Sequence, residues 1–244
     1  MLPLSDPDLI TRRRPTINIV LISLCTLVFI YELTLVGISR EVFFYKLGFI
    51  PVELTRGTTL HMVPTPSESI DVTSPIPDWM TLFTSMFIHE GWLHILGNML
   101  YLWVFGDNIE DRLGHFKYLV FYLAAGLFAA LLQTLANMNS DMPNIGASGA
   151  IAGVLGAYIV FFPYSHIRTM VIFFFITFIR IPALVLLGFW FFLQFASGVG
   201  SIGLADLDGV AYWAHIGGFV FGMSVAFICK IATRHKYREI HPVA

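Results

Sequence analysis

A serine between glycines is the residue in this chain whose surroundings best suit covalent chemistry. Gly146-Ala147-Ser148-Gly149 stands where a polar loop gives way to an apolar run. A serine hydroxyl attacks a carbonyl carbon when a base within hydrogen-bond reach takes its proton, and that base is most often an imidazole. The flanking glycines would let a substrate backbone come close. The motif therefore suggests acyl transfer, provided that a histidine lies beside Ser148.

The same stretch also has a purely structural explanation. Small residues recur three or four positions apart, at Gly146, Gly149, Gly153 and Gly156. This spacing puts them on one side of a helix, where they let a neighbouring backbone approach. Ser148 would then bond back to a carbonyl of its own helix. Soluble hydrolases with a comparable motif need a strand before the serine, and we expect none here, so the case for chemistry depends on the rest of the chain.

Three further polar side chains stand in apolar runs, namely His94, Asn98 and His215. His215 could take the proton of Ser148. His94 and Asn98 are one helical turn apart on one side of a helix, and both could donate to a tetrahedral oxyanion, as could the Ser148 backbone N–H. No carboxylate lies in an apolar run near this level, so we expect a Ser-His dyad rather than a triad.

A metal site is the competing interpretation of the first histidine cluster. His89 and His94 are five residues apart, not the four of the helical zinc motif, so their imidazoles would diverge by about 140°. We therefore expect no metal and no cofactor, and we interpret His89 as a structural hydrogen-bonding residue. Cys25 and Cys229 both fall in apolar runs, which indicates neither a disulfide nor a zinc site.

The composition indicates that membrane-spanning helices must position the serine, the histidines and the asparagine. The chain has 244 residues, of which 57% are hydrophobic and 12% charged, against roughly 45–50% and 25% in soluble domains. It is therefore predicted to be a polytopic membrane protein surrounded by a lipid bilayer, with no nucleic-acid partner. The first apolar run follows three arginines, but it is about 20 residues long and no small-residue cleavage site follows it, so it is a retained span rather than a signal peptide.

We expect an all-α fold of six transmembrane helices. The apolar runs place the spans at about Ile17–Val36, Leu93–Ile109, Phe116–Leu135, Gly146–Pro163, Pro182–Ser197 and Val210–Ile231. The run from Thr169 to Ser197 is too long for one untilted span. Residues 169–179 would lie in the membrane interface, Arg180 would snorkel, and Pro182 would lie in the first turn of span 5.

The remaining segments divide the chain into three parts. Residues 1–16 form an N-terminal segment that is disordered or lies on the surface, residues 17–231 form the membrane domain, and residues 232–244 form a tail. Within the membrane domain, the long outer loop 37–78 has enough apolar content to lie partly in the interface. Glu110 with Arg112 is interpreted as a structural pair or cap, and Asp206 and Asp208 as solvated loop residues that could also influence the site.

Basic residues predict the orientation of the spans. The N-terminal segment, the turn after span 2, the link after span 4 and the tail carry Lys and Arg, whereas the loops after spans 3 and 5 carry none. Both termini are therefore placed in the cytoplasm. The four polar side chains would then lie at the same level of the outer leaflet, about 5 to 12 Å below its surface. They are Ser148, His215, His94 and Asn98. Ionisable groups at such a depth are costly and usually functional.

Three motifs together resemble those of a known family. His94-Ile95-Leu96-Gly97-Asn98, Gly146-Ala147-Ser148-Gly149-Ala150 and the segment Ala214–Gly222 look like the H-x-x-x-N, G-x-S-G and A-H-x-x-G-x-x-x-G motifs of rhomboid intramembrane serine proteases. They occur in the family's order and on the matching spans, and Glu110-Asp111-Arg112-Leu113-Gly114 resembles another family element. The similarity covers about residues 40–230, and the joint occurrence of the three motifs makes it specific.

The resemblance implies a serine endopeptidase that cleaves transmembrane protein substrates within or beside their membrane segment. It implies Ser148 as nucleophile, His215 as general base, and Asn98 and His94 as oxyanion donors.

The resemblance also implies how the spans are used. Gly218 and Gly222 would let span 6 pack against span 4. Span 5 would be a lateral gate, and the link before span 6 would cap the site.

Two departures from the family pattern are visible. Some members have an aromatic residue four positions after the serine that stacks on the histidine, whereas this chain has Ala152, so Trp213 or Tyr212 is the candidate for orienting His215. The Trp-Arg pair that some members carry in the first loop is not evident, because Met80 follows Trp79. Neither departure removes a reacting group.

Two other functions remain as alternatives. The first is a non-catalytic rhomboid-like protein that binds transmembrane clients, but inactive relatives are expected to lose the serine or the histidine. The second is a proton-coupled transporter with His94 and His215 as proton relays. Such a transporter would require inverted repeats as well as acidic residues in the spans, and the sequence shows no inverted repeat. The short tails and the lack of a transit peptide favour a prokaryotic inner membrane. The natural substrate, the cleavage-site preference and the oligomeric state are left open.

Overall fold

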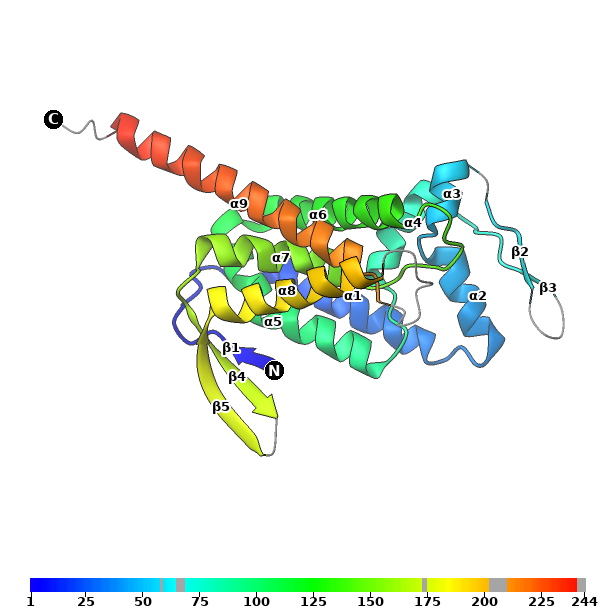
Figure 1. Ribbon diagram of the computed structural model, residues 1–244, viewed down its shortest axis with the longest axis horizontal. Coiled ribbons are helices and arrows are strands. Elements are labelled where there is room, and N and C mark those ends of the chain that lie inside the picture. The colour runs from blue at the N-terminus through cyan, green and yellow to red at the C-terminus, as the bar shows by residue number, and fades with distance from the viewer. Residues whose placement is uncertain (58, 65–68, 173–174, 202–209, 241–244) are drawn as a thin grey trace.

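Long helices make up most of the structure, which is a computed structural model (Figure 1). It describes residues 1–57, 59–64, 69–172, 175–201 and 210–240. The side chains of residues 64 and 233–240 are not described. The long helices run side by side along one direction. They are α1 (Thr16–Glu32), α5 (Trp92–Leu113), α6 (His115–Ala136), α7 (Ser148–Phe161), α8 (Ala183–Gly200) and α9 (Tyr212–Ile240). Helices α6 and α8 and the Tyr212–Ala232 part of α9 are long and apolar enough to cross a membrane, and α1 and α7 are shorter apolar helices.

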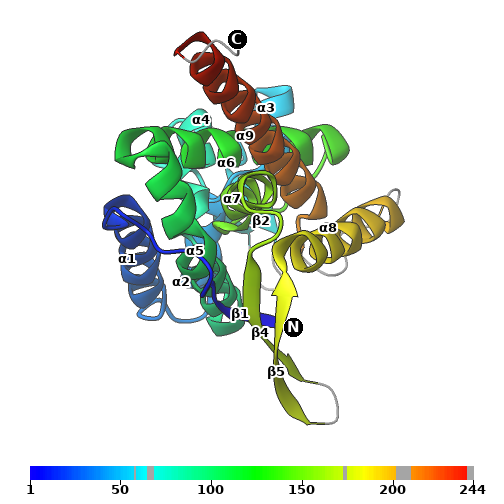
Figure 2. The same ribbon diagram turned by 90° about the vertical axis from the view of Figure 1, so that its left-hand side faces the viewer.

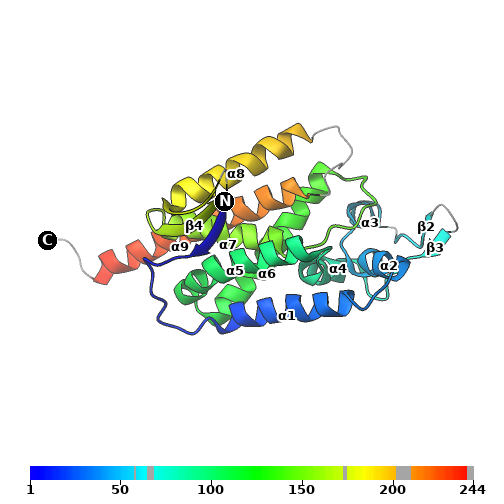
Figure 3. The same ribbon diagram turned by 90° about the horizontal axis from the view of Figure 1, so that it is seen from below.

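Helix α7 lies in the middle of the bundle. Viewed along its axis, it is surrounded by α5, α6, α8 and α9, while α1 and α8 lie on opposite sides of the molecule (Figures 2 and 3). All its residues from Gly149 to Ile159 are buried. This is possible because six of the 14 residues of the helix are glycine or alanine, which let neighbouring helices approach on every side. The core around it contains Phe105, Tyr118 and Phe219 from three different helices.

Short elements cover the end of the bundle at which α7 begins. They belong to the segment between α1 and α5 and comprise α2 (Ile38–Leu47), α3 (Pro51–Arg56), the antiparallel strands β2 (Met62–Pro64) and β3 (Ser69–Asp71), α4 (Asp78–Thr84) and the 3-10 turn η1 (Ser85–Phe87). Phe49 exchanges both backbone hydrogen bonds with Asn144. The long loop is thus tied to the segment that leads into α7.

A small antiparallel sheet lies at the opposite end and corrects the expected all-α fold. Its strands are β1 (Leu2–Ser5), β4 (His166–Ile172) and β5 (Ile176–Pro182), in the order β1-β4-β5. The hairpin β4–β5 alternates side chains between two faces and is rich in β-branched and aromatic residues, which favour strands. Pairing also satisfies the backbone groups of a segment that is too long to be part of a single span.

This sheet bears on two local predictions. Pro182 ends β5 and precedes α8, instead of lying in the first turn of the helix. The N-terminal segment keeps one of its two expected alternatives: it lies on the surface, where β1 pairs with β4 and the Asp6 carboxylate accepts hydrogen bonds from Tyr158 and Ser165.

The helix boundaries differ from the predicted spans mainly at two places. Helix α1 ends at Glu32 instead of Val36, and α9 continues to Ile240, beyond the predicted end at Ile231. Asp206 and Asp208, together with most of the predicted cap before span 6, lie outside the described residues.

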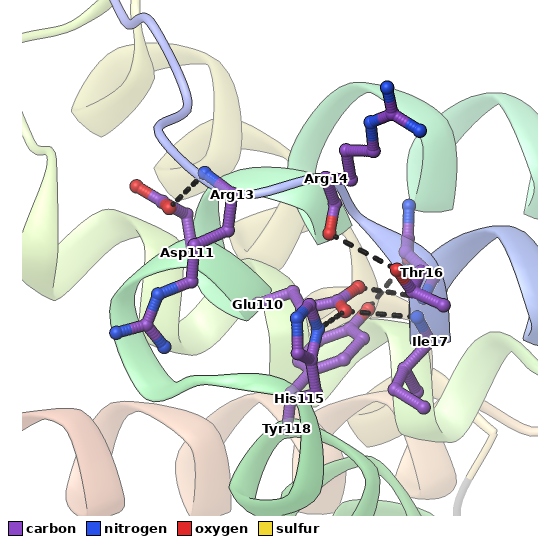
Figure 4. A network of polar contacts seen from close by, with 9 residues as sticks. Arg13, Arg14, Thr16, Ile17, Glu110, Asp111, His115 and Tyr118 are labelled. Carbon is purple, nitrogen blue, oxygen red and sulfur yellow. Dashed lines mark hydrogen bonds and ion pairs between the residues drawn. The ribbon is translucent and has the colours of Figure 1, made fainter.

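A buried carboxylate joins the first and second long helices (Figure 4). Glu110 is fully buried and accepts hydrogen bonds from the backbone N–H groups of Ile17 and Asn18, at 2.9 and 2.8 Å. These N–H groups belong to the first turn of α1, where no intrahelical acceptor exists. Glu110 also contacts His115 at 2.5 Å. The predicted cap is therefore present, but it caps α1, while Arg112 stacks over the ring of Phe161.

Candidate active site

Ser148 is the first residue of α7 and follows a tight backbone turn. Gly146 has a φ of 120°, which side-chain-bearing residues rarely adopt. A Cβ atom at Gly146 would also lie 2.6 Å from Nε2 of His94. The N–H of Gly146 donates to the carbonyl of Ser85 at 2.8 Å. Glycine is therefore required at 146 both for the turn and for the space that the His94 ring occupies.

The imidazole of His215 lies beside the serine. Its Nε2 atom is 2.8 Å from Oγ of Ser148. His215 is in the first turn of α9, and the preceding N–H, that of Ala214, donates to Oε1 of Gln133 on α6 at 3.2 Å. Two residues that are 67 positions apart in sequence are thus within hydrogen-bond distance, and the helix start that carries His215 is held by a third helix.

Glycines bring α7 and α9 into backbone contact just below this pair. A side chain at Gly218 would overlap the carbonyl oxygen of Gly149, and one at Gly222 would overlap that of Gly153. Gly156 is packed in the same way against the backbone of Phe219. The structure therefore brings together the glycines that were predicted to let these two helices pack closely.

The second ring nitrogen of His215 also has a partner. Nδ1 lies 2.6 Å from Oε1 of Gln194 on α8. The ring of Trp190, one turn earlier on α8, has its centroid 5.9 Å from that of His215. We expected Trp213 or Tyr212 to orient the histidine, but the hydrogen bond comes from α8. Gln194 was not among the predicted site residues, although a polar side chain within an apolar run is costly there and is a signal of function.

The two predicted oxyanion donors, His94 and Asn98, lie on α5. The Asn98 side-chain N–H donates to the carbonyl of His94 at 2.9 Å. An amide NH₂ group carries two protons, so this bond leaves the other one for an oxyanion. The His94 ring packs against Gly146 and, edge to face, against the ring of His89, with centroids 5.1 Å apart. His94 thus lies against the turn that leads into Ser148, and Asn98 lies one helical turn further along α5.

His89 lies at the base of this cluster and has structural contacts. It is fully buried, its backbone N–H donates to Glu32 at 3.2 Å, and its Nδ1 lies 3.2 Å from the carbonyl of Phe87. Within the described part of the chain, no three His, Cys, Asp or Glu residues are grouped so that they could hold a metal ion.

A cleft open to solvent lies beside Ser148. One part of its lining consists of small residues from three helices, namely Gly126, Ala129, Ala130, Gly149, Ala150 and Ala214. Phe49, Leu82 and Met86 line another part. The cleft can therefore take a side chain of modest size next to the hydroxyl, and Gln133 and Asn144 add polar groups to its wall.

Comparison with known proteins gives a consistent result. A family model described as a Rhomboid domain matches residues 77–231. Rhomboid protease AarA of Providencia stuartii is 28% identical over 228 residues, which cover 84% of this chain and 74% of that protein. RHOMBOID-like protein 1 of Arabidopsis thaliana is 31% identical over 64% of this chain, and mitochondrial Rhomboid protein 1 of Saccharomyces cerevisiae is 29% identical over 66% of it. The matches span only 36% and 45% of the lengths of these two eukaryotic relatives.

Proposed function

The chain belongs to the rhomboid family, and from this premise we propose that it is an intramembrane serine endopeptidase that cleaves membrane-anchored proteins within or beside their transmembrane segment. The observation that carries the proposal is the 2.8 Å contact between Oγ of Ser148 and Nε2 of His215. The family and the long apolar helices make the chain an integral, multi-pass membrane protein. Its substrates would therefore reach the site from the same bilayer.

The proposed reaction uses the two side chains in turn. Oγ of Ser148 attacks the carbonyl carbon of the scissile peptide bond while its proton passes to Nε2 of His215. When the C–N bond breaks, His215 gives this proton to the leaving amine and an acyl-serine remains. A water molecule then loses a proton to His215 and attacks the ester, which releases the second product and restores the serine hydroxyl.

The oxyanion that forms in each half-reaction needs donors. Ser148 is the first residue of α7, so its backbone N–H has no intrahelical partner and the positive end of the helix dipole faces the same place. The His94 imidazole, which lies against Gly146, and the Asn98 amide, one helical turn further along α5, complete the proposed set.

The proposed topology has six crossings, by α1 and α5 to α9. Basic residues place both termini in the cytoplasm, and the cleft beside Ser148 would then open near the outer surface. In this arrangement residues 17–231 form the membrane domain, with residues 1–16 and 232–244 outside it.

The test is cleavage of a membrane-anchored reporter by the purified protein, together with labelling by a fluorophosphonate, which traps an activated serine. Replacing either reacting group should lower the cleavage rate by at least about a thousandfold, because neither works without the other. We therefore expect Ser148→Ala and His215→Ala to abolish both cleavage and labelling.

Ser197→Ala is the matched control, since it makes the same change at an exposed position on α8 and should leave both signals intact. Cleavage that survives in Ser148→Ala would refute the assignment. An unmodified protein that is folded but neither cleaves nor labels would favour the non-catalytic, client-binding alternative.

A further inference from the structure

Gln194 is a polar side chain in an apolar stretch of α8, between the runs Phe189–Leu193 and Phe195–Ala196. An amide in such a stretch loses its hydrogen bonds to water, and this costs free energy unless a protein group replaces them. Its partner is the imidazole of His215, whose Nδ1 lies 2.6 Å from the Gln194 amide oxygen. The contact joins α8 to the side chain that the proposed reaction needs as its base.

One face of α8 is shaped for this contact. Trp190, Gln194 and Gly198 are four residues apart and therefore lie one above another on the helix. Trp190 lies against the His215 ring, and Gly198 is buried where a Cβ would be 3.0 Å from the side chain of Ile216. The start of α9 is thus in contact with three successive turns of α8.

The helix itself is held in place by aromatic packing. The ring of Phe191 stacks on that of Phe219 with centroids 4.5 Å apart and planes at 20°, and Trp190 contacts the same ring at 6.0 Å. Because Phe219 is one turn after His215 on α9, the position of Gln194 is fixed relative to the imidazole by neighbours on both helices.

The chemistry of the two groups determines what the contact does. A neutral imidazole carries one N–H, and an amide oxygen can only accept. With Oε1 of Gln194 at Nδ1, the proton is on Nδ1 and the lone pair of Nε2 faces the Ser148 hydroxyl, as a base requires. When Nε2 takes the serine proton, the imidazolium keeps its acceptor at Nδ1, and the ring of Trp190 remains beside it.

We propose that Gln194 is a positioning residue for His215, which holds the imidazole in the tautomer that can deprotonate Ser148. The inference rests on the proposed function. It completes the Ser-His dyad with a neutral amide from α8, in the role that a carboxylate has in a triad. It also accounts for Ala152, since no aromatic residue at that position is needed to hold the ring.

The test compares two replacements of nearly equal size in the purified full-length protein. Gln194→Met removes the acceptor, and we expect kcat for a reporter substrate to fall about tenfold to hundredfold with KM unchanged, because part of the His215 population takes the wrong tautomer. Gln194→Glu retains an oxygen that accepts in either protonation state, and it should keep kcat within about threefold of the unmodified protein. Leu193→Met puts the same side chain on the exposed side of α8 and should change neither constant.

A spectroscopic measurement separates positioning from packing. In ¹⁵N-histidine-labelled protein, the His215 signals, identified by their loss in His215→Ala, should show protonated Nδ1 in the unmodified protein and a mixture of tautomers in Gln194→Met. Equal loss of kcat in both Gln194 variants, or an unchanged tautomer in Gln194→Met, would overturn the inference. Wild-type kcat in Gln194→Met would overturn it while leaving the proposed function intact, whereas a Ser148→Ala variant that still cleaves would refute the proposed function itself.

Discussion

At the scale of single residues, Gly218 decides how close the serine comes to the histidine. Its missing side chain lets the backbone of α9 touch the carbonyl of Gly149, one residue after Ser148. His215 is three residues before Gly218, so any separation of the helices here moves the imidazole away from the hydroxyl. A hydrogen bond of 2.8 Å tolerates only a few tenths of an ångström of such movement. The backbone contact between α7 and α9 therefore also sets the distance between the Ser148 hydroxyl and the His215 imidazole.

Gly218→Ala tests this coupling. The added methyl group would overlap the Gly149 carbonyl, so α7 and α9 must separate, at a cost of about 1–3 kcal/mol in the free energy of unfolding. We expect reporter cleavage to fall more than about tenfold, as measured together with the thermal unfolding midpoint in detergent.

The matched control is Gly188→Ala on α8, where a Cβ would meet no described atom within 4 Å. Alanine inside a helix is favoured over glycine by about 0.5–1 kcal/mol, so this variant should be as stable as the unmodified protein or more so, and equally active. Wild-type activity in Gly218→Ala would show that the helix contact does not set the geometry of the pair.

At the scale of secondary-structure elements, the hairpin β4–β5 differs most from expectation. One face carries Met170, Ile172, Ile176 and Phe178, which follow the pairing register of the strands, and Arg168 stacks over Phe178 at 5.6 Å. Ile172, Ile176 and Phe178 are all more than half exposed. Our expectation that residues 169–179 lie in the membrane interface stays a prediction, now for a hairpin: apolar side chains would enter the lipid while arginines remain at the headgroups.

A nitroxide label at Phe178→Cys, with Cys25 and Cys229 replaced by alanine, tests the position of this hairpin in reconstituted bilayers. Apolar oxygen concentrates in lipid and a nickel chelate in water, so we expect the label to collide more with oxygen. Asp141→Cys, on the exposed polar loop before α7, serves as the aqueous control and should show the reverse. Equal preference at the two positions would rule out an interfacial hairpin.

At the scale of the whole molecule, polar contacts at one end join segments that are far apart in the chain. Glu110 accepts both first-turn N–H groups of α1, and Arg13 donates its backbone N–H to Asp111 (Figure 4). On the N-terminal side of α1, Asp8 accepts hydrogen bonds from His166 at the start of β4, and these lower the pKa of the Asp8 carboxyl. The contacts lie at the end opposite Ser148, so they bear on stability rather than on the chemistry.

Glu110→Gln tests this separation. Each carboxylate oxygen of Glu110 accepts one backbone N–H of α1. In Glu110→Gln, the amide NH₂ would face one of these N–H groups, and two donors cannot pair. The free energy of unfolding should therefore fall by about 1–3 kcal/mol. Glu41→Gln, at an exposed position on α2, should not alter the unfolding midpoint. Cleavage per folded molecule should be equal in both variants, and a specific loss of kcat in Glu110→Gln would contradict the proposed separation.

The sequence by itself identified the proposed reacting groups and determined the helices that carry them. His215 is recognisable because an ionisable side chain in an apolar run is costly and usually functional, and Ser148 is recognisable because its motif occurs together with those that contain His94 and His215. The apolar runs are long enough to specify their own helices, since a backbone in a membrane must satisfy its hydrogen bonds within each segment. The family membership confirms the recognition that those motifs supported.

Only the tertiary structure decided which side chains meet. The partner of Nδ1 of His215 comes from a helix 21 residues earlier in the chain, and helical periodicity within α8 does not say which of its faces meets α9. The hairpin β4–β5 was missed because strands satisfy their hydrogen bonds through a partner strand, so an apolar run of that length does not specify its structure alone. Local composition thus determined the helices and supports the proposed chemistry, whereas packing between helices decided which of the side chains in that proposal lie within hydrogen-bond distance.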